Sequence, residues 1–210
     1  GHSINHHRKG HLITQELIEG VDRGFHSLDS ELEQDYKELC EIADAAGESK
    51  VYIVASNHNE FLDRYLDEGR FVKDPINARM AFRLAEALSY GKNPVEEGMK
   101  YFGKIPKNVR FLSRDQDLKM RGYQLAAHGD KGYSGGSRSI KSKENDYGRS
   151  ISGHTHSAEI LRDTYIVGTS TPLTMFYAKG SPTKWTNSNA LLWDTGTVQM
   201  VHIIDGKWRL

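Results

Sequence analysis

The sequence predicts an α/β fold in which helices cover mixed β-sheets. Helix signals fill most of the first half of the chain, and short β-rich segments separated by turn residues fill the second half. One apolar segment, 51–55, is typical of a strand buried on both faces. A chain of 210 residues with 37% apolar residues can bury one sizeable core, or one core with a helical attachment.

The helices are predicted from their start and stop signals. Start signals stand at three places: a capping box at Ser30 and Glu33, and an N-cap followed by proline at Asp74-Pro75 and at Asn93-Pro94. Gly47 supplies the stop for the first helix. Apolar residues at helical spacing predict two more helices, near 12–21 and 61–66. We therefore expect a helical segment over 1–49, which could act as an assembly arm, followed by one domain over 50–210.

The strands are predicted from short apolar or β-branched runs between turn residues. Six are expected in the second half: 109–112, 122–127, 150–152, 164–167, 190–193 and 198–204. Asp194-Thr195-Gly196 predicts a hairpin with a three-residue loop between the last two. The segment 133–147 is rich in Gly, Ser and Lys and is expected to be a mobile loop.

Charge is unevenly distributed, although the net charge is zero. Residues 29–68 hold 12 acidic and 3 basic residues, whereas residues 104–149 hold 11 basic and 5 acidic ones. A basic surface would suit a polyanionic substrate such as nucleic acid. Both blocks could equally be ordinary solvated faces.

The cysteine content and the hydropathy of the sequence indicate the cellular compartment in which the protein is expected. The single Cys40 excludes an internal disulfide framework and fits a reducing compartment. No apolar stretch reaches the roughly 18 residues that cross a bilayer. We expect a cytoplasmic protein with no membrane partner.

Asn and His residues gather at three separated points, each at or just after a predicted strand. The three motifs are Ser56-Asn57-His58-Asn59, His128-Gly129 and Gly153-His154-Thr155-His156. Neutral imidazoles and amide oxygens are ligands that Mn²⁺, Fe²⁺ and Zn²⁺ accept. The motifs therefore predict a site for divalent metal ions.

In this order the motifs resemble the calcineurin-like metallophosphoesterases. That family carries Asp-x-His, Gly-Asp-x-x-Asp, Gly-Asn-His-Asp/Glu, a lone His-Gly and Gly-His-x-His, of which the last three are found here. Flanking segments resemble a phage-type branch that includes pre-early, host-DNA-degrading nucleases: His128–Gly132, Gly135–Arg138, Gly168–Thr171, Tyr177–Pro182 and Lys184–Asn187. The resemblance covers most of residues 50–210 and implies a β-sandwich flanked by helices. Because the first two motifs are missing and the chain begins with Gly-His, we expect the C-terminal part of such an enzyme, without its N-terminal strands.

The resemblance implies which residues hold metal. Asn57, His128 and His154 would bind the second ion, and His156 the first. The full site would take two divalent ions, with Mn²⁺ expected and Fe²⁺ or Zn²⁺ as alternatives. The missing Gly-Asp-x-x-Asp motif supplies the carboxylate that bridges the ions, so this fragment would hold one ion or none and would be inactive alone.

The resemblance also implies a catalytic role for His58. It would protonate the leaving oxygen or stabilise the transition state, which suits an imidazole that titrates near neutrality. Asn59 stands where the family usually has Asp or Glu. Asp63 and Glu60 are the carboxylates that could orient His58 instead.

Basic residues near His128 are candidates for substrate contacts. Lys131, Arg138 and Lys141, in a stretch that also holds Lys143, would follow a phosphodiester backbone, or would simply be exposed. A further polar cluster is formed by Asn5, His6, His7 and His11, which could line the site or be an ordinary polar start.

Three functions therefore remain open. The first is a metal-dependent nuclease with DNA as its substrate. The second is a phosphomonoesterase or protein phosphatase on the same scaffold. The third is a non-catalytic fragment whose acidic N-terminal helices drive assembly, for example into a homo-oligomer, or bind a partner.

Overall fold

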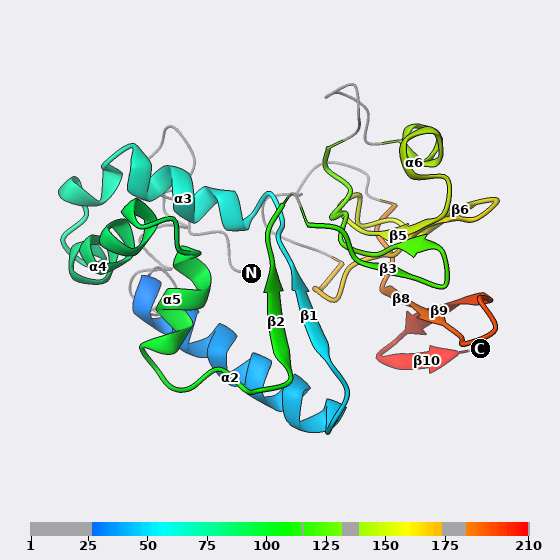
Figure 1. Cartoon of the computed structure of the whole chain (residues 1–210), viewed down its shortest axis with the longest axis horizontal. Coiled ribbons are helices and arrows are strands. Elements are labelled where there is room, and N and C mark those ends of the chain that lie inside the picture. Colours follow the sequence, from blue (N-terminus) through cyan, green and yellow to red (C-terminus); the bar gives the residue numbers. More distant parts are fainter. Residues whose placement is uncertain (1–26, 115, 132–138, 174–183, 210) are drawn as a thin grey trace. The chain divides into compact units, whose positions relative to one another are not determined.

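The computed structural model describes residues 27–114, 116–131, 139–173 and 184–209. These residues form a mixed α/β structure of five α-helices and several small sheets (Figure 1). The predicted α/β class is confirmed, whereas the metallophosphoesterase-type sandwich stays a prediction. Within the described ranges, no helix is both long and apolar enough to cross a membrane.

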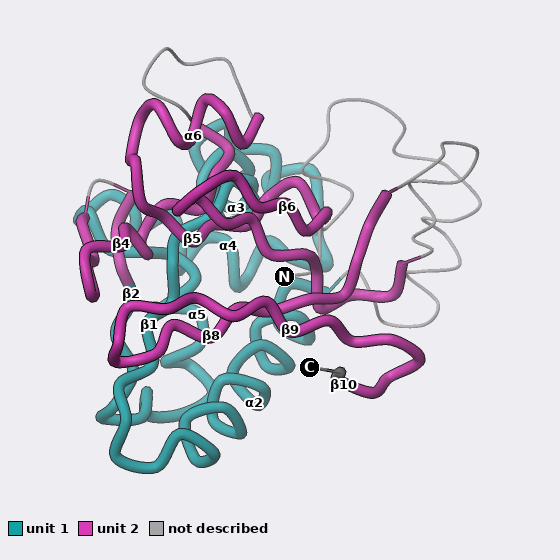
Figure 2. The backbone as a smooth tube through the Cα atoms, turned by 90° about the vertical axis from the view of Figure 1, so that its right-hand side faces the viewer, with its two compact units in different colours: residues 1–111 teal, residues 112–210 magenta. Residues whose placement is uncertain are grey.

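The chain divides into two compact units, residues 1–111 and 112–210, which Figure 2 colours separately. The boundary predicted at residue 49 falls inside the first unit. The predicted helix near 12–21 lies outside the described residues. Assembly through the N-terminal segment therefore stays a prediction.

The first unit is mainly helical. Its elements are α2 (Leu28–Ala46), β1 (Val51–Val54), α3 (Asn59–Asp67), the 3-10 helix η2 (Arg70–Lys73), α4 (Ala78–Ser89), α5 (Pro94–Lys100) and β2 (Val109–Leu112). β1 and β2 pair and run in the same direction (Figure 1). All residues of β1 are half-buried, so the prediction of a strand buried on both faces was wrong. The reason is that the described sheet has two strands, and each of them is an edge.

Helix α2 begins three residues earlier than its predicted capping box. Ser27 has extended backbone angles, and its hydroxyl accepts a hydrogen bond from the Ser30 amide at 3.3 Å. Leu28 then lies inside the helix with 2% of its surface exposed, which places the start before Ser30. The predicted stop is confirmed, because Gly47 follows Ala46 with a φ of 59°.

Of the two Asn/Asp-Pro start signals, one is confirmed and one was wrong. Asn93 caps α5 by accepting from the Val95 amide at 2.9 Å, with Pro94 at the first helical position. Asp74 instead ends η2, and α4 starts later, after Asn77. The Asp74 carboxylate is used elsewhere, since it accepts from Tyr65 Oη at 2.8 Å and Asn77 Nδ2 at 2.9 Å.

The core of this unit lies between α2, α3 and α4. It consists of Leu28, Leu32, Leu62, Tyr65, Leu66, Phe71, Met80, Ala81 and Leu84. A second cluster joins α2 to α5 and β2 through Leu39, Ala43, Met99 and Val109. Packing is close at Leu32, because a methyl group added to Gly98 would lie 2.6 Å from Leu32 Cδ1.

Leu32→Ala is expected to lower the free energy of unfolding by about 2–5 kcal/mol, because it opens a cavity in the core. Leu32 is 3% exposed, whereas Ile42 on the same helix is 55% exposed. Ile42→Ala should therefore stay within about 0.5 kcal/mol of the unchanged protein. Equilibrium unfolding in urea measures both. Equal effects of the two substitutions would contradict the assigned core.

The second unit holds two sheets. Its elements are β3 (Lys119–Met120), β4 (Tyr123–Gln124), α6 (Ile140–Tyr147), β5 (Ser150–Ser152), β6 (Glu159–Leu161), β7 (Thr164–Ile166), β8 (Ser188–Leu192), β9 (Val198–Ile204) and β10 (Lys207–Arg209). One sheet has the order β3-β4-β5-β7-β6, and the other has the order β10-β9-β8. In the larger sheet, β4 and β5 are parallel, as are β5 and β7.

The predicted strands of this unit are largely confirmed, and the predicted loop is partly wrong. The β8–β9 hairpin closes through Trp193, whose amide donates to Thr197 O at 2.9 Å around the expected three-residue loop. Residues 140–147, expected to be part of a mobile loop, form α6. Ser139 caps this helix by accepting from the Ser142 amide, and Gly148 ends it with a φ of 66°.

Candidate metal centre

His128 and His154 are brought together by two parallel strands. His128 follows β4, and His154 follows β5, with Gln124 of β4 paired to Ser150 of β5. Parallel strands carry their carboxyl ends at the same edge of a sheet, so the segments after them meet there. The Gly153 amide joins these segments by donating to His128 O at 3.0 Å.

The two imidazoles face each other closely. His154 Nδ1 lies 3.3 Å from His128 Nε2, and the ring centroids are 5.1 Å apart at 80°. Two nitrogens bound to one tetrahedral ion at 2.0–2.1 Å lie about 3.3 Å apart, so this spacing fits a pair of metal ligands. It also fits a hydrogen bond in which one ring donates to the other. The pair can therefore share either a proton or a metal ion.

The backbone around His154 is conformationally unusual. His154 has a φ of 79° and His156 a φ of 62°, values in the left-handed region that non-glycine residues rarely adopt. Such residues cost on the order of 1–3 kcal/mol and often occur at functional sites. The turn 153–156 is therefore held in place by contacts outside itself.

His156 has different surroundings from His154. Its ring packs edge-on against Trp185 with the centroids 4.5 Å apart, and its carbonyl accepts from the Thr186 amide at 2.9 Å. Burial lowers the pKa of His156. Among the residues that the structure describes, no three His, Cys, Asp or Glu side chains are grouped to hold a metal. The structure thus brings together His128 and His154, and the role of His156 as a ligand stays a prediction.

Lys143 is a residue of this centre that its sequence pattern did not reveal. It was expected in the basic stretch that follows a phosphodiester backbone, but it is fully buried, so that assignment was wrong. Its Nζ donates to Gly153 O at 3.2 Å. Burial lowers the pKa of Lys143 to about 8, while the charges of Glu159 and Asp130 act to raise it.

An ion pair lies next to this lysine. Arg114 binds both carboxylate oxygens of Asp130, with Nη1 2.8 Å from Oδ1. Burial would raise the pKa of Asp130, but the hydrogen bonds and charge of Arg114 hold it at about 2. Asp130 is therefore ionised at neutral pH and ties the segment after His128 to Arg114.

The structure describes only some of the other residues that were expected to contact substrate. Lys131 and Lys141 are exposed, as expected for residues that could meet a substrate. Arg138 lies outside the described residues, as do Asn5, His6, His7 and His11. Their roles stay predictions.

Asn57 and His58 lie in the first unit, in the turn between β1 and α3. The Asn59 side chain holds this turn, since its Oδ1 accepts from the Ser56 amide at 2.8 Å and from Ser56 Oγ at 2.6 Å. The His58 ring is exposed and stacks on Phe61 at 5.2 Å. Asn59 thus has a structural task in place of the expected carboxylate. Burial, with the charge of Glu60, raises the pKa of Asp63.

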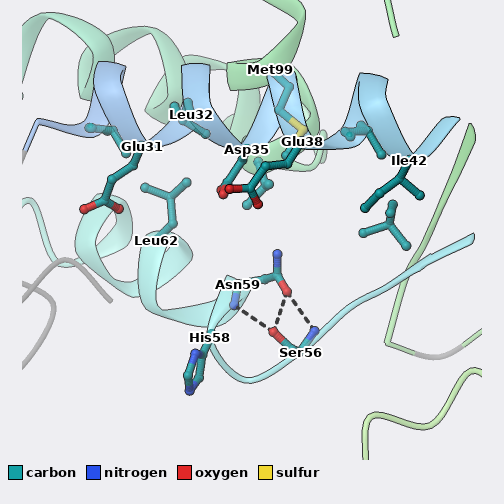
Figure 3. Close-up of a pocket in the computed structure, with 14 residues that line it drawn as sticks. Glu31, Leu32, Asp35, Glu38, Ile42, Ser56, His58, Asn59, Leu62 and Met99 are labelled. Carbon is teal, nitrogen blue, oxygen red and sulfur yellow. Dashed lines mark hydrogen bonds between the residues drawn. The ribbon is translucent and has the colours of Figure 1, made fainter. Parts of the chain in front are cut away.

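A pocket of about 310 Å³ lies between this turn and α2 (Figure 3). Three acidic side chains of α2, Glu31, Asp35 and Glu38, line the wall opposite Ser56 and Asn59. The pKa of Glu31 is raised to about 9 by burial and by the charge of Asp35. Glu31 therefore stays protonated at neutral pH. The His58 ring lies on the side of the turn away from α2 (Figure 3).

The chain is similar in sequence to a protein of a bacteriophage. The chain is 30% identical over 170 residues to Protein A1 of Escherichia phage T5, an alignment that covers 76% of this chain. The chain spans about 30% of the length of that relative. No protein-family model matches the chain, and no solved structure matches it significantly. The chain is therefore similar to a phage protein whose name states no activity.

Proposed function

We propose that this chain is part of a protein that hydrolyses the phosphodiester bonds of DNA with the help of divalent metal ions. His128 and His154 hold one of these ions in the proposal. The observation that supports it most directly is the 3.3 Å between His154 Nδ1 and His128 Nε2, the spacing of two ligands on one ion.

Each part of the centre has a task in this proposal. His128 and His154 supply neutral imidazole nitrogens to one ion, and His156, in the same turn, is the ligand that the family resemblance assigns to the other ion. A divalent ion held there would supply positive charge to neutralise the phosphate oxygens. His58 is the proposed acid for the leaving oxygen, and Asn57 stays a predicted ligand from the sequence.

DNA is preferred over a small phosphate ester because of the charge around His128. Lys131 and Lys141 are exposed, and the block 104–149 holds 11 basic and 5 acidic residues. Cations in such a position can contact successive phosphates of a nucleic acid. The similarity to a phage protein also fits the phage-type branch that the flanking segments resemble.

The deciding experiment incubates the complete protein with plasmid DNA, linear DNA and a small aryl phosphate in the presence of Mn²⁺. Cleavage of DNA that stops on addition of a chelator is the expected result. Turnover of the aryl phosphate without DNA cleavage would favour a phosphomonoesterase. Absence of both activities would contradict a hydrolytic function and would favour the third alternative, a non-catalytic protein that acts in assembly.

A variant with both Lys131→Gln and Lys141→Gln is expected to bind DNA with a weaker salt dependence. The slope of log affinity against log salt should fall by about 0.9 for each phosphate that the variant no longer neutralises. Hydrolysis of the aryl phosphate should not change, because that substrate does not extend beyond the metal centre.

The matched control neutralises Lys50 and Lys73, which are exposed lysines outside the basic block. That variant should keep the original slope. Filter binding or fluorescence anisotropy at several salt concentrations measures both variants. An equal loss in DNA binding and aryl phosphate turnover would mean that Lys131 and Lys141 shape the centre rather than contact DNA.

A further inference from the structure

We infer that Lys143 is a positioning residue for the candidate metal centre, whose ammonium group fixes the spacing of the His128 and His154 imidazoles. This inference rests on the proposed function of the two histidines as metal ligands. Lys143 lies in α6 with 0% of its surface exposed. Burying an ammonium group is costly, so a lysine at such a position needs polar contacts that an apolar side chain could not replace.

The ammonium group lies beside both segments that carry the imidazoles. Its Nζ donates to Gly153 O at 3.2 Å, and Gly153 directly precedes His154. A methyl group added to Gly129, which directly follows His128, would lie 2.6 Å from the same nitrogen. One amine therefore donates to the residue before the second imidazole and lies close to the residue after the first.

The contacts of Lys143 act on backbone that needs support. His154 has a φ of 79°, whereas Gly129, with a φ of 105°, is a glycine and adopts that conformation without strain. A non-glycine residue keeps such a conformation only when its surroundings fix it. Lys143 donates its hydrogen bond to the carbonyl of the peptide group that joins Gly153 to His154. The bond therefore supports the strained residue directly. Burial lowers the pKa of Lys143 to about 8, and the carboxylates of Glu159 and Asp130 act in the opposite direction, toward the charged form.

Lys143→Met in the 210-residue chain tests the inference, because methionine keeps the length of the side chain and removes the ammonium group. Zn²⁺ affinity, measured by calorimetry, should fall by about 10–100-fold, as is usual when a group that orients a ligand is removed. In the metal-free protein, the ¹⁵N signals of the His128 and His154 rings should shift.

Lys141→Met is the matched control. Lys141 lies on the same helix, loses the same charge and is exposed. It should leave both the Zn²⁺ affinity and the imidazole signals unchanged. Equal behaviour of Lys143→Met and the unchanged protein in both measurements would overturn the inference.

The imidazole signals separate this inference from the proposed function. If the unchanged chain bound no Zn²⁺, the proposed function would fail, while the signals of metal-free Lys143→Met would still decide the role of Lys143. If Lys143→Met did not fold, the role of Lys143 would be tested on the ammonium signal of the unchanged protein. Its Lys143 ammonium should then show slow exchange and a coupling to the Gly153 carbonyl carbon, and a rapidly exchanging ammonium without that coupling would refute the role.

Discussion

His154→Ala is expected to weaken binding of Mn²⁺ or Zn²⁺ to this chain by more than about 100-fold. Removing a group that merely orients a ligand costs about 10–100-fold in affinity, so removing the ligand itself should cost more. His154 Nδ1 lies 3.3 Å from His128 Nε2. The substitution removes the imidazole of His154, so only that of His128 is left to bind the ion. Calorimetry measures the affinity and the number of ions bound, which we expect to be one.

The control for this substitution is His202→Ala. His202 is an exposed histidine of β9 in the same unit, so its loss removes an imidazole without touching the pair. Its Mn²⁺ and Zn²⁺ affinities should match those of the unchanged chain. Two equally tight sites would contradict the expected single ion. Binding that His154→Ala does not alter would show that the 3.3 Å contact is a hydrogen bond between rings and not a metal centre.

Local signals in the sequence predicted the strands well where turn chemistry and side-chain pattern agree. Strands 150–152 and 198–204 match β5 and β9, and the loop 194–196 closes the hairpin as expected. The start signal at Asp74-Pro75 misled because the carboxylate of Asp74 bonds to Tyr65 and Asn77 instead of capping α4. A capping residue and a residue that joins two elements look the same in a sequence, since only tertiary contacts distinguish them.

The candidate centre was predictable to the extent that it depends on motifs at strand ends. His128 and His154 follow two strands that turn out to be parallel neighbours, which brings them together. Lys143 was not predictable as a buried residue, because it lies in a polar segment with other lysines. Its burial follows from the packing of α6 against β5, β6 and β7, which the sequence pattern of α6 does not reveal.

His58→Ala is expected to lower turnover of DNA by the complete protein by about 10²–10⁴-fold, the usual contribution of a placed general acid. The imidazole is exposed at the turn before α3 and stacks on Phe61, so it can meet a substrate in solution. Metal content should stay near that of the unchanged protein, since the proposal gives His58 no ligand role.

A control at Phe61 distinguishes proton transfer by His58 from a structural effect of the stacked pair. Phe61→Leu removes the stacked ring and keeps the imidazole, so it should lose much less turnover than His58→Ala if His58 donates a proton to the leaving oxygen. Loss of bound metal together with activity in His58→Ala would instead make His58 a ligand or a residue that holds the turn, because a placed acid contributes to the rate and not to metal affinity.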